Sequence, residues 1–413
     1  MNRRAFLAGA AALSAGCGAS ASRELTGFEA IRADFPRSSP ENVYLNNASQ
    51  HPISRSTARV IQEYADYLAG ELTRQPGAKA SEKAVEHRDA HLKDCKELFG
   101  RLINASPREI TYTLSTTMGE NIVLNGMDLR GGNVVTNDLH YSACLYNYRM
   151  RQESGLDVRI ARHQDWRIDM DALSRLIDRK TRLVALTLVS NVNGLLADVR
   201  KISEMAHANG AYVYADIIQG VGAVPVDVKA MGIDFAACST YKWLMGLRGF
   251  AYLYIREDLQ GSVVRPTEFG GGLSFNYPPW TANPDPAKPD FVFTPKSGGS
   301  QYEVGNVSSI AAAAQFEALS LIHRTGVPQI AAHIRTLTDR LQSELPAMGY
   351  PSITPKDNAS PIVTFQLRDP KAVEDKLQRA NIEVTLRFGN QMRVSPGVYN
   401  NQQDIDALLA ALA

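Results

Sequence analysis

Short apolar runs alternate with amphipathic helical patterns through the middle of the chain, and this alternation restricts the fold more than any other feature. The strand-like runs are 109–112, 133–136, 158–161, 183–187, 212–215 and 235–238. Helical patterns at 170–178 and 199–209 lie between them, which implies right-handed crossovers and a mostly parallel sheet. The 413-residue chain is therefore predicted to be an α/β protein, and its length suggests two domains.

The flanking regions follow other patterns. Residues 22–50 are expected to be irregular, and 53–72 is predicted to be an amphipathic helix. Residues 266–306 contain Gly270, Gly271 and Gly272 and many prolines, and they are expected to form a long functional loop. Helices over 308–323 and 328–345 and a small α/β segment complete the chain.

Charge and cysteine content exclude several kinds of partner. With 44 basic and 43 acidic residues the formal net charge is +1, so we expect no nucleic-acid partner and favour a small zwitterionic or neutral substrate. The cysteines show neither a disulfide framework nor a C-x-x-C spacing, and the histidines form no paired motif, so no metal site is predicted.

The first 21 residues resemble a twin-arginine signal peptide. Arg3 and Arg4 precede the apolar run 8–15, and 19–21 offers a small-residue cleavage site. The run is shorter than the roughly 20 residues that span a bilayer. We therefore expect the twin-arginine export machinery to carry the folded protein to the periplasm, with lipidation at Cys17 as a minor alternative.

Lys242 and Asp216 both follow strand-like runs, and together they indicate a chemistry. Ligands of open α/β sheets bind beyond the carboxyl ends of strands. An aldehyde cofactor needs an amine that forms a Schiff base, and a pyridine ring needs a carboxylate that keeps its nitrogen protonated. Lys242 and Asp216 would fill these roles in a pyridoxal 5'-phosphate (PLP) site, although each residue alone could be an ordinary loop or strand-end residue.

Six segments in order resemble the class V aminotransferase family, in the branch of cysteine desulfurases, selenocysteine lyases and isopenicillin N epimerase. They are Tyr44–Ala48, Ser115–Asn121, Val189–Gly194, Asp216–Gln219, Ser239–Lys242 and Tyr302–Asn306. The resemblance implies the PLP-dependent fold type I, with a mostly parallel seven-stranded sheet flanked by helices. It also implies an N-terminal segment (22–50) that packs on the small domain, a large PLP-binding domain (51–305) and a small C-terminal α/β domain (306–413).

The resemblance also assigns roles to residues. It implies that Thr116 and Thr117 form a phosphate cradle and that His140, with Tyr141 as a substitute, stacks on the cofactor ring. It also implies that the amides of Asn191 and Gln219 bond the phenolic oxygen of the cofactor and that Ser239 and Tyr241 lie near its phosphate. Thr116 and Thr117 could alternatively be simple helix N-caps. Asn306 stands where the family has a threonine that reaches the neighbouring subunit's phosphate, which implies a homodimer.

Substrate recognition is expected at the C-terminal end of the chain. Arg393 matches the family's arginine for a substrate α-carboxylate, and Arg387 is a second candidate. Cysteine desulfurases carry a catalytic cysteine on the preceding loop, but here 385–391 has none. Desulfurase activity is therefore disfavoured.

The expected function is that of an exported PLP enzyme acting on an amino acid or an amino-acid-derived substrate, which includes a peptide natural product. With Lys242, Asp216 and His140 as catalytic residues, transamination or related carbanion chemistry at Cα is favoured. Elimination at a C–S or other β bond, epimerisation, and a non-catalytic protein that keeps the fold remain alternatives.

Overall fold

The structure is a computed structural model, and it describes residues 27–39, 41–71, 82–270, 273–275, 281–283, 285–288, 291–293 and 296–413. The predicted signal peptide, with Cys17, lies outside these residues. Among the described helices, none is both long enough and apolar enough to cross a membrane.

A seven-stranded sheet forms the centre of the molecule, as expected. Its order is β2 (Ile110–Thr113), β10 (Ala251–Ile255), β9 (Phe235–Ser239), β8 (Tyr212–Asp216), β7 (Thr181–Thr187), β3 (Asn133–Asn137) and β4 (Asp157–Ala161). The strands from β9 to β4 are parallel, and β10 runs antiparallel to both of its neighbours. All strands predicted from the sequence are present, and β10 is an addition to them.

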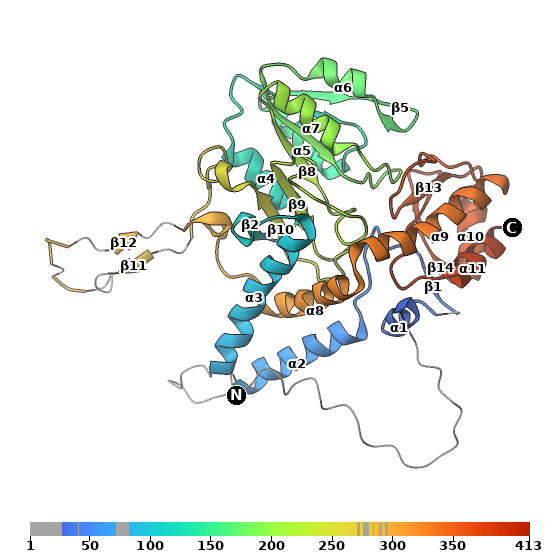
Figure 1. The fold of residues 1–413 in the computed structure, drawn as a ribbon, viewed down its shortest axis with the longest axis horizontal. Coiled ribbons are helices and arrows are strands. Elements are labelled where there is room, and N and C mark those ends of the chain that lie inside the picture. The colour runs from blue at the N-terminus through green and yellow to red at the C-terminus, as the bar shows by residue number, and fades with distance from the viewer. Residues whose placement is uncertain are drawn as a thin grey trace, which may run out of the picture.

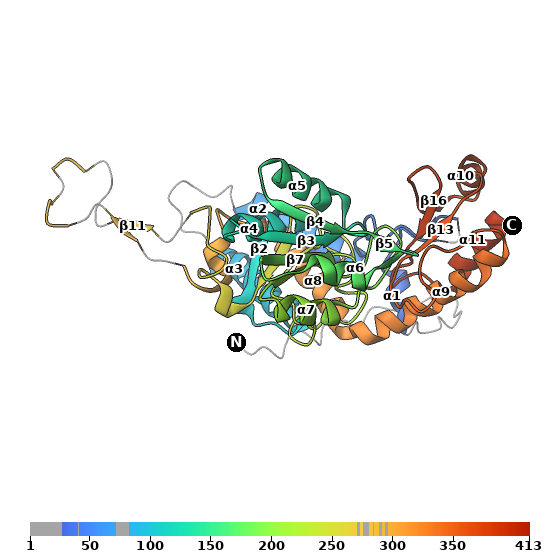
Figure 2. The ribbon, with the colours of Figure 1, turned by 90° about the horizontal axis from the view of Figure 1, so that it is seen from above.

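Helices cover both faces of this sheet (Figures 1 and 2). On one face, α4 (Thr116–Gly126) and α5 (Ser142–Glu153) share a core with alternate strand residues such as Phe235 and Ala237. On the other, α7 (Val199–Ala208) packs in a core with Ala236 and Cys238. This alternation follows from the two-residue period of a strand, and it explains why nearly all of the central strand residues are apolar.

Three further helices complete the large core. α2 (Arg55–Glu71) and α3 (Glu82–Ile103) both pack against α8 (Ser309–Thr325). α6 (Met170–Leu176) lies near β4 and the short hairpin of β5 (His163–Gln164) and β6 (Arg167–Ile168). β11 (Leu273–Phe275) and β12 (Phe291–Phe293) pair within the segment expected to be a loop, and this hairpin projects away from the body (Figures 1 and 2).

The C-terminal region has its own sheet and its own apolar cluster. The sheet order is β13 (Val363–Gln366), β16 (Gln391–Val394) and β15 (Thr385–Arg387). α9 (Val327–Ala347), α10 (Pro370–Arg379) and α11 (Gln402–Leu412) supply the cluster with residues such as Leu341, Leu377 and Leu408. The domain boundaries expected at 50 and 305 stay predictions.

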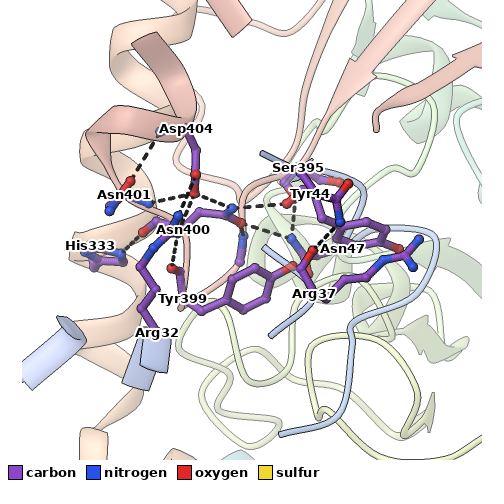
Figure 3. A network of polar contacts seen from close by, with 12 residues as sticks. Arg32, Arg37, Tyr44, Asn47, His333, Ser395, Tyr399, Asn400, Asn401 and Asp404 are labelled. Carbon is purple, nitrogen blue, oxygen red and sulfur yellow. Dashed lines mark hydrogen bonds and ion pairs between the residues drawn. The ribbon is translucent and has the colours of Figure 1, made fainter. Parts of the chain in front are cut away.

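The segment expected to be irregular contains α1 (Gly27–Ala33) and β1 (Val43–Tyr44), which pairs with β14 (Ile382–Glu383). Tertiary contacts hold this short helix, because Arg32 bonds both oxygens of Asp404 at 2.8 and 2.9 Å and Phe28 stacks on His333 at 3.9 Å. The pair of Arg32 and Asp404 belongs to a larger network of polar contacts, which Figure 3 shows. We call it the junction network, and it is formed by Arg32, Tyr44, Asn47, His333, Ser395, Tyr399, Asn400, Asn401 and Asp404.

Candidate active site

A cavity of about 310 Å³ opens at the carboxyl ends of the central strands. This is the edge at which open α/β sheets bind their ligands. Residues at or just beyond the ends of β2, β7, β8 and β9 supply much of its wall. The lining residues are Leu114, Ser115, Thr116, Thr117, Tyr141, Thr187, Asn191, Asp216, Ile218, Gln219, Ser239, Tyr241, Lys242, Arg248 and Gly249.

Lys242 stands on the turn after β9, with its side chain almost wholly buried. Burial lowers the pKa of its amine to about 8, although Asp216 acts in the opposite direction. The turn is closed by a hydrogen bond from Met245 N to Lys242 O of 2.8 Å. Gly222, on the loop after β8, has a φ of +92°, and a Cβ there would lie 2.5 Å from the carbonyl oxygen of Trp243. Only glycine therefore lets this loop pack against the Lys242 turn.

Asp216 ends β8 and is buried, with 1% of its surface exposed. Its Oδ1 accepts a hydrogen bond of 3.0 Å from Ile218 N. Burial raises the pKa of this carboxyl, while the nearby His140 and Lys242 lower it. A buried carboxylate and a buried amine thus share one cavity, an arrangement typical of functional sites.

The N-terminus of α4 forms another part of the wall. Ser115 is its N-cap, because Ser115 Oγ accepts from Met118 N at 3.1 Å, so neither Thr116 nor Thr117 has that role. Ser239 Oγ accepts from Thr116 N at 2.8 Å, and Ser239 N donates to Thr116 Oγ1 at 2.9 Å. Thr117 lies in the first turn, where backbone N–H groups have no acceptor within the helix and can bind an anion.

Asn191 links the cavity to the C-terminal region. Its backbone oxygen accepts from Arg393 Nη1 at 3.0 Å and from Arg387 Nη1 at 2.5 Å. Burial lowers the pKa of Arg393 to about 10, and its Nε has no hydrogen-bond partner among the described residues. Asn191 Oδ1 is likewise buried without a partner in the described ranges. Both arginines lie beside the cavity and outside its lining.

Gln219 and Tyr241 complete the predicted cofactor residues in this cavity. Gln219 Nε2 donates to Ala48 O at 2.9 Å, and its Oε1 accepts from Trp243 Nε1 at 2.9 Å. Since an amide nitrogen carries two protons, one stays available for a ligand. The Tyr241 ring lies 5.7 Å from Lys242 Nζ and 5.2 Å from Arg248 Cζ.

Two of the predicted cofactor residues do not line the cavity. His140 is buried, with 1% exposed, and it is Tyr141 that lines the wall, with its ring 6.0 Å from Lys242 Nζ. Asn306 lines a second cavity of about 240 Å³, which shares Leu114 with the first. The stacking and phosphate-binding roles expected of these residues stay predictions.

Arg248 is a pocket residue that the sequence motifs did not indicate. It is exposed and lies on the loop after Lys242, next to Gly249. The only signal in the sequence is its position six residues after the lysine, which is weak because loop arginines are commonly solvated.

Cys95, Cys144 and Cys238 are buried free thiols. Burial raises the pKa of each, to about 12 for Cys95, so none is a ready thiolate. The turn between β15 and β16 consists of Phe388, Gly389 and Asn390 and holds no cysteine.

These features define an α/β protein with a buried lysine–aspartate pair at the strand ends, beside a helix N-terminus that is able to bind an anion. The aminotransferase class-V family matches residues 43–408, and the chain belongs to this family. A probable cysteine desulfurase of Methanothermobacter thermautotrophicus is 29% identical over 373 residues, which are 89% of this chain and 88% of the relative. A cysteine desulfurase of Klebsiella pneumoniae is 27% identical, over 93% of this chain and 97% of the relative.

Solved structures share the fold. The cysteine desulfurase of Thermococcus onnurineus matches with a TM-score of 0.79 at 22% identity, over 94% of this chain and 98% of that one. A cystine C-S lyase, solved with its product cysteine persulfide, matches with a TM-score of 0.78 at 22% identity, over 92% of this chain and 98% of that one. The same lyase has been solved with glycine covalently linked to its PLP cofactor. The fold is therefore the PLP-dependent fold type I, and the protein is a PLP-dependent enzyme.

The residues of the cavity fit this cofactor. Lys242 offers an amine with a lowered pKa, Asp216 a buried carboxylate, and α4 an N-terminus suited to a phosphate. Asn191 Oδ1 is a buried polar atom still lacking a partner among the described residues.

Proposed function

We propose that the protein acts on a small molecule with an amino group next to a carboxylate, by transamination or related chemistry at the α-carbon. Support comes above all from one observation: the Lys242 amine, with its pKa lowered to about 8, is buried in the same cavity as the Asp216 carboxylate. When bound there, PLP supplies an electron sink for the electrons of a broken bond at the α-carbon.

The chain's own residues would hold the substrate and move its proton. Lys242 takes the α-proton as a general base, since a pKa near 8 leaves about a tenth of the amine unprotonated at pH 7. Asp216 would hold the ring nitrogen of the cofactor, and the amides of Gln219 and Asn191 would hold its phenolic oxygen. Thr117 N–H and neighbouring groups at the start of α4 would hold the phosphate.

Arg393, with Arg387 beside it, is proposed to bind the substrate carboxylate. Both guanidinium groups meet at the backbone oxygen of Asn191, a residue of the cavity wall. The Nε of Arg393 supports this proposal, because a buried guanidinium N–H without a partner is free to donate to a carboxylate.

Elimination of a β-substituent, including cleavage of a C–S bond, is the second candidate. One structural neighbour is named a cystine C-S lyase, and several relatives are named cysteine desulfurases. A desulfurase that forms its persulfide on a loop cysteine stays disfavoured, because the turn from Phe388 to Asn390 has none and the three described cysteines are buried. Epimerisation is a further alternative.

Export and assembly belong to the same proposal. Arg3 and Arg4 support transport by the twin-arginine machinery to the periplasm, where an exported amino-acid derivative or a peptide natural product would be the substrate. A homodimer is supported by the second cavity, in which Asn306 lies near the exposed side chains of Leu114 and Val304.

The test is the visible absorption spectrum of the purified mature protein during addition of amino acids and amino-bearing peptides. A stable loss of the cofactor band that a keto acid reverses would support transamination. Recovery of the band with release of an elimination product would instead support the lyase alternative, and recovery with inverted substrate would support epimerisation. A protein that binds no PLP contradicts the proposal.

A further inference from the structure

Four buried polar side chains lie behind the cavity wall, and the proposed mechanism does not use them as a group. We call them the Glu120 cluster: Glu120 on α4, His140 before α5, and Cys144 and Tyr148 on α5. All of them are at most 1% exposed. Tyr148 donates from its hydroxyl to Glu120 Oε1 at 2.5 Å, and His140 Nε2 lies 3.6 Å from the same oxygen. Glu120 Oε2 and His140 Nε2 have no hydrogen-bond partner in the described part of the chain.

The cluster contacts the cavity wall along two elements. Glu120 lies one helical turn after Thr116, which lines the cavity. His140 precedes Tyr141, another lining residue, and Tyr141 N donates to His140 Nδ1 at 2.8 Å. Glu120 and His140 also act electrostatically on Asp216. A change of charge at Glu120 will therefore change the electrostatic potential inside the cavity.

Burial of the charged Glu120 side chain is energetically unfavourable. Burial raises the pKa of its carboxyl, but His140, Cys144 and Tyr148 outweigh this effect, and the pKa lies below its ordinary value. The side chain is thus a carboxylate with one oxygen unpaired. Because apolar replacements of buried charges are often neutral or stabilising, stability gives no reason for a charge here. Buried charges beside a cavity are more typical of function.

The charged and titratable groups around Glu120 come from two elements besides its own. α5 and the turn before it contribute His140, Cys144, Tyr148 and Arg151, and β8 contributes Tyr214 and Asp216. Arg151 is the only guanidinium in this set, and it binds the side-chain oxygens of Asn121 and Asn125. No lysine or arginine of the described residues forms an ion pair with Glu120.

A metal ion is the alternative explanation, because Glu120, His140 and Cys144 place one potential ligand atom each within 4.8 Å of one another. Two observations oppose it. A metal-bound Nε2 needs its proton on Nδ1, but His140 Nδ1 accepts the N–H of Tyr141, so a neutral ring carries its proton on Nε2. Burial also raises the pKa of Cys144, whereas a ligand must be a thiolate.

We propose that Glu120 is a positioning residue: its charge, held by Tyr148, fixes the Nε2–H tautomer of His140 and supplies negative potential that stabilises positive charge on the cofactor bound at Lys242. The proposal rests on the proposed function, since it needs PLP in the cavity. It assigns Glu120 to the tuning of the site, through His140 and Asp216, without contact with substrate.

The experiment is a pH titration of the visible cofactor band in the PLP-loaded protein. Glu120→Gln keeps the shape and removes the charge, so the midpoint is expected to fall by about one pH unit, the size of a partly screened charge effect over a short distance. Glu120→Asp keeps the charge and is expected to restore the midpoint. Glu109→Gln is the matched control, because Glu109 is also buried but precedes β2, at the end of that strand away from the cavity.

Several results would overturn the proposed role of Glu120. An unchanged midpoint in Glu120→Gln overturns the proposal, as does stoichiometric metal in the purified protein that this variant loses. If the Glu120→Gln variant does not fold, the wild-type apoprotein still tests the proposal. In ¹⁵N NMR of the His140 ring, the proton is expected on Nε2, and a proton on Nδ1 overturns the proposal. A wild-type protein without any cofactor band would refute the proposed function itself, which separates the two failures.

Discussion

The junction network and the cavity wall are both built from buried polar groups, but they differ in how fully these groups are paired. In the junction network, Asp404 receives both Nη atoms of Arg32, the side chain of Asn400 and the backbone N–H of Asn401. Around the cavity, Arg393 Nε and Asn191 Oδ1 are buried without partners in the described residues.

This difference separates polar groups that hold the fold from those that await a ligand. Buried polar atoms are normally paired, and each unpaired one lowers stability. Fully paired networks therefore fix one arrangement, as the junction network does for α1 and α11. Unpaired groups persist where a substrate or cofactor completes them. Substitutions in the two regions should then affect different quantities.

The largest effect is expected for Lys242→Ala. Since this change removes both the covalent attachment point of PLP and the general base, turnover should fall by about 10⁴-fold or more. The free energy of unfolding should not fall, because the buried amine with its lowered pKa destabilises the fold below about pH 8. Steady-state kinetics and thermal unfolding of the apoprotein measure the two quantities. Lys201→Ala, on the exposed face of α7, is the control and should change neither. Turnover near the wild-type value in Lys242→Ala would refute the mechanism.

The opposite result is expected in the junction network. Asp404→Ala removes the carboxylate that pairs with Arg32 and accepts from Asn400, so the free energy of unfolding should fall by about 3 kcal/mol. The cofactor band of the folded variant should be unchanged. Asp339→Ala breaks an ion pair with Arg335 whose side chains are both 55% exposed, and it should cost at most about 0.5 kcal/mol. Equal losses in the two variants, measured by denaturant unfolding, would remove the distinction between the regions.

Arg393→Gln tests the unpaired guanidinium next to the cavity. Loss of a charge-assisted bond to a substrate carboxylate should lower kcat/KM by about 10²-fold, mainly through KM. Arg387→Gln should have a smaller effect, because Arg387 is half-buried and, among the described residues, donates a hydrogen bond to Asn191 O. Cofactor affinity should be unaffected in both variants. A larger loss of kcat/KM in Arg387→Gln than in Arg393→Gln would indicate that Arg387, and not Arg393, is the main ligand of the substrate carboxylate.

The sequence predicts much of the fold because its strands have strong local signals. The apolar runs that follow or precede helices all became strands of the central sheet. β10 was missed although Ala251–Ile255 is apolar throughout, because it follows β9 without a crossover helix and pairs antiparallel. α1 was missed because a seven-residue helix depends on tertiary contacts, here those of Arg32 and Phe28.

The candidate site was predictable only in part. Motif residues such as Asp216, Ser239 and Lys242 lie at strand ends, where the topology brings them together. Side-chain direction is not readable in this way: Tyr141 lines the cavity, whereas His140 is buried, and the stacking role expected of His140 stays a prediction. Glu120 gave no signal, because a glutamate in a helix is usually solvated, and only packing against α5 shows that it is buried.

The smallest effect expected is a pH dependence that follows from the buried amine of Lys242. Only the unprotonated amine attacks the aldehyde of PLP, so cofactor capture by the apoprotein should slow tenfold per pH unit below about 8, where an ordinary lysine would break near 10.5. The same shift affects stability. Between about 8 and 10.5 the unfolded chain binds this proton and the folded chain does not, so the free energy of unfolding should rise with pH across that window. Stopped-flow mixing with PLP and denaturant unfolding check the two trends, with Lys242→Ala as the control that abolishes both. A capture rate that keeps rising up to pH 10 would show that Lys242 titrates like a solvated lysine. The difference drawn here between the cavity and the junction network would then no longer hold for Lys242.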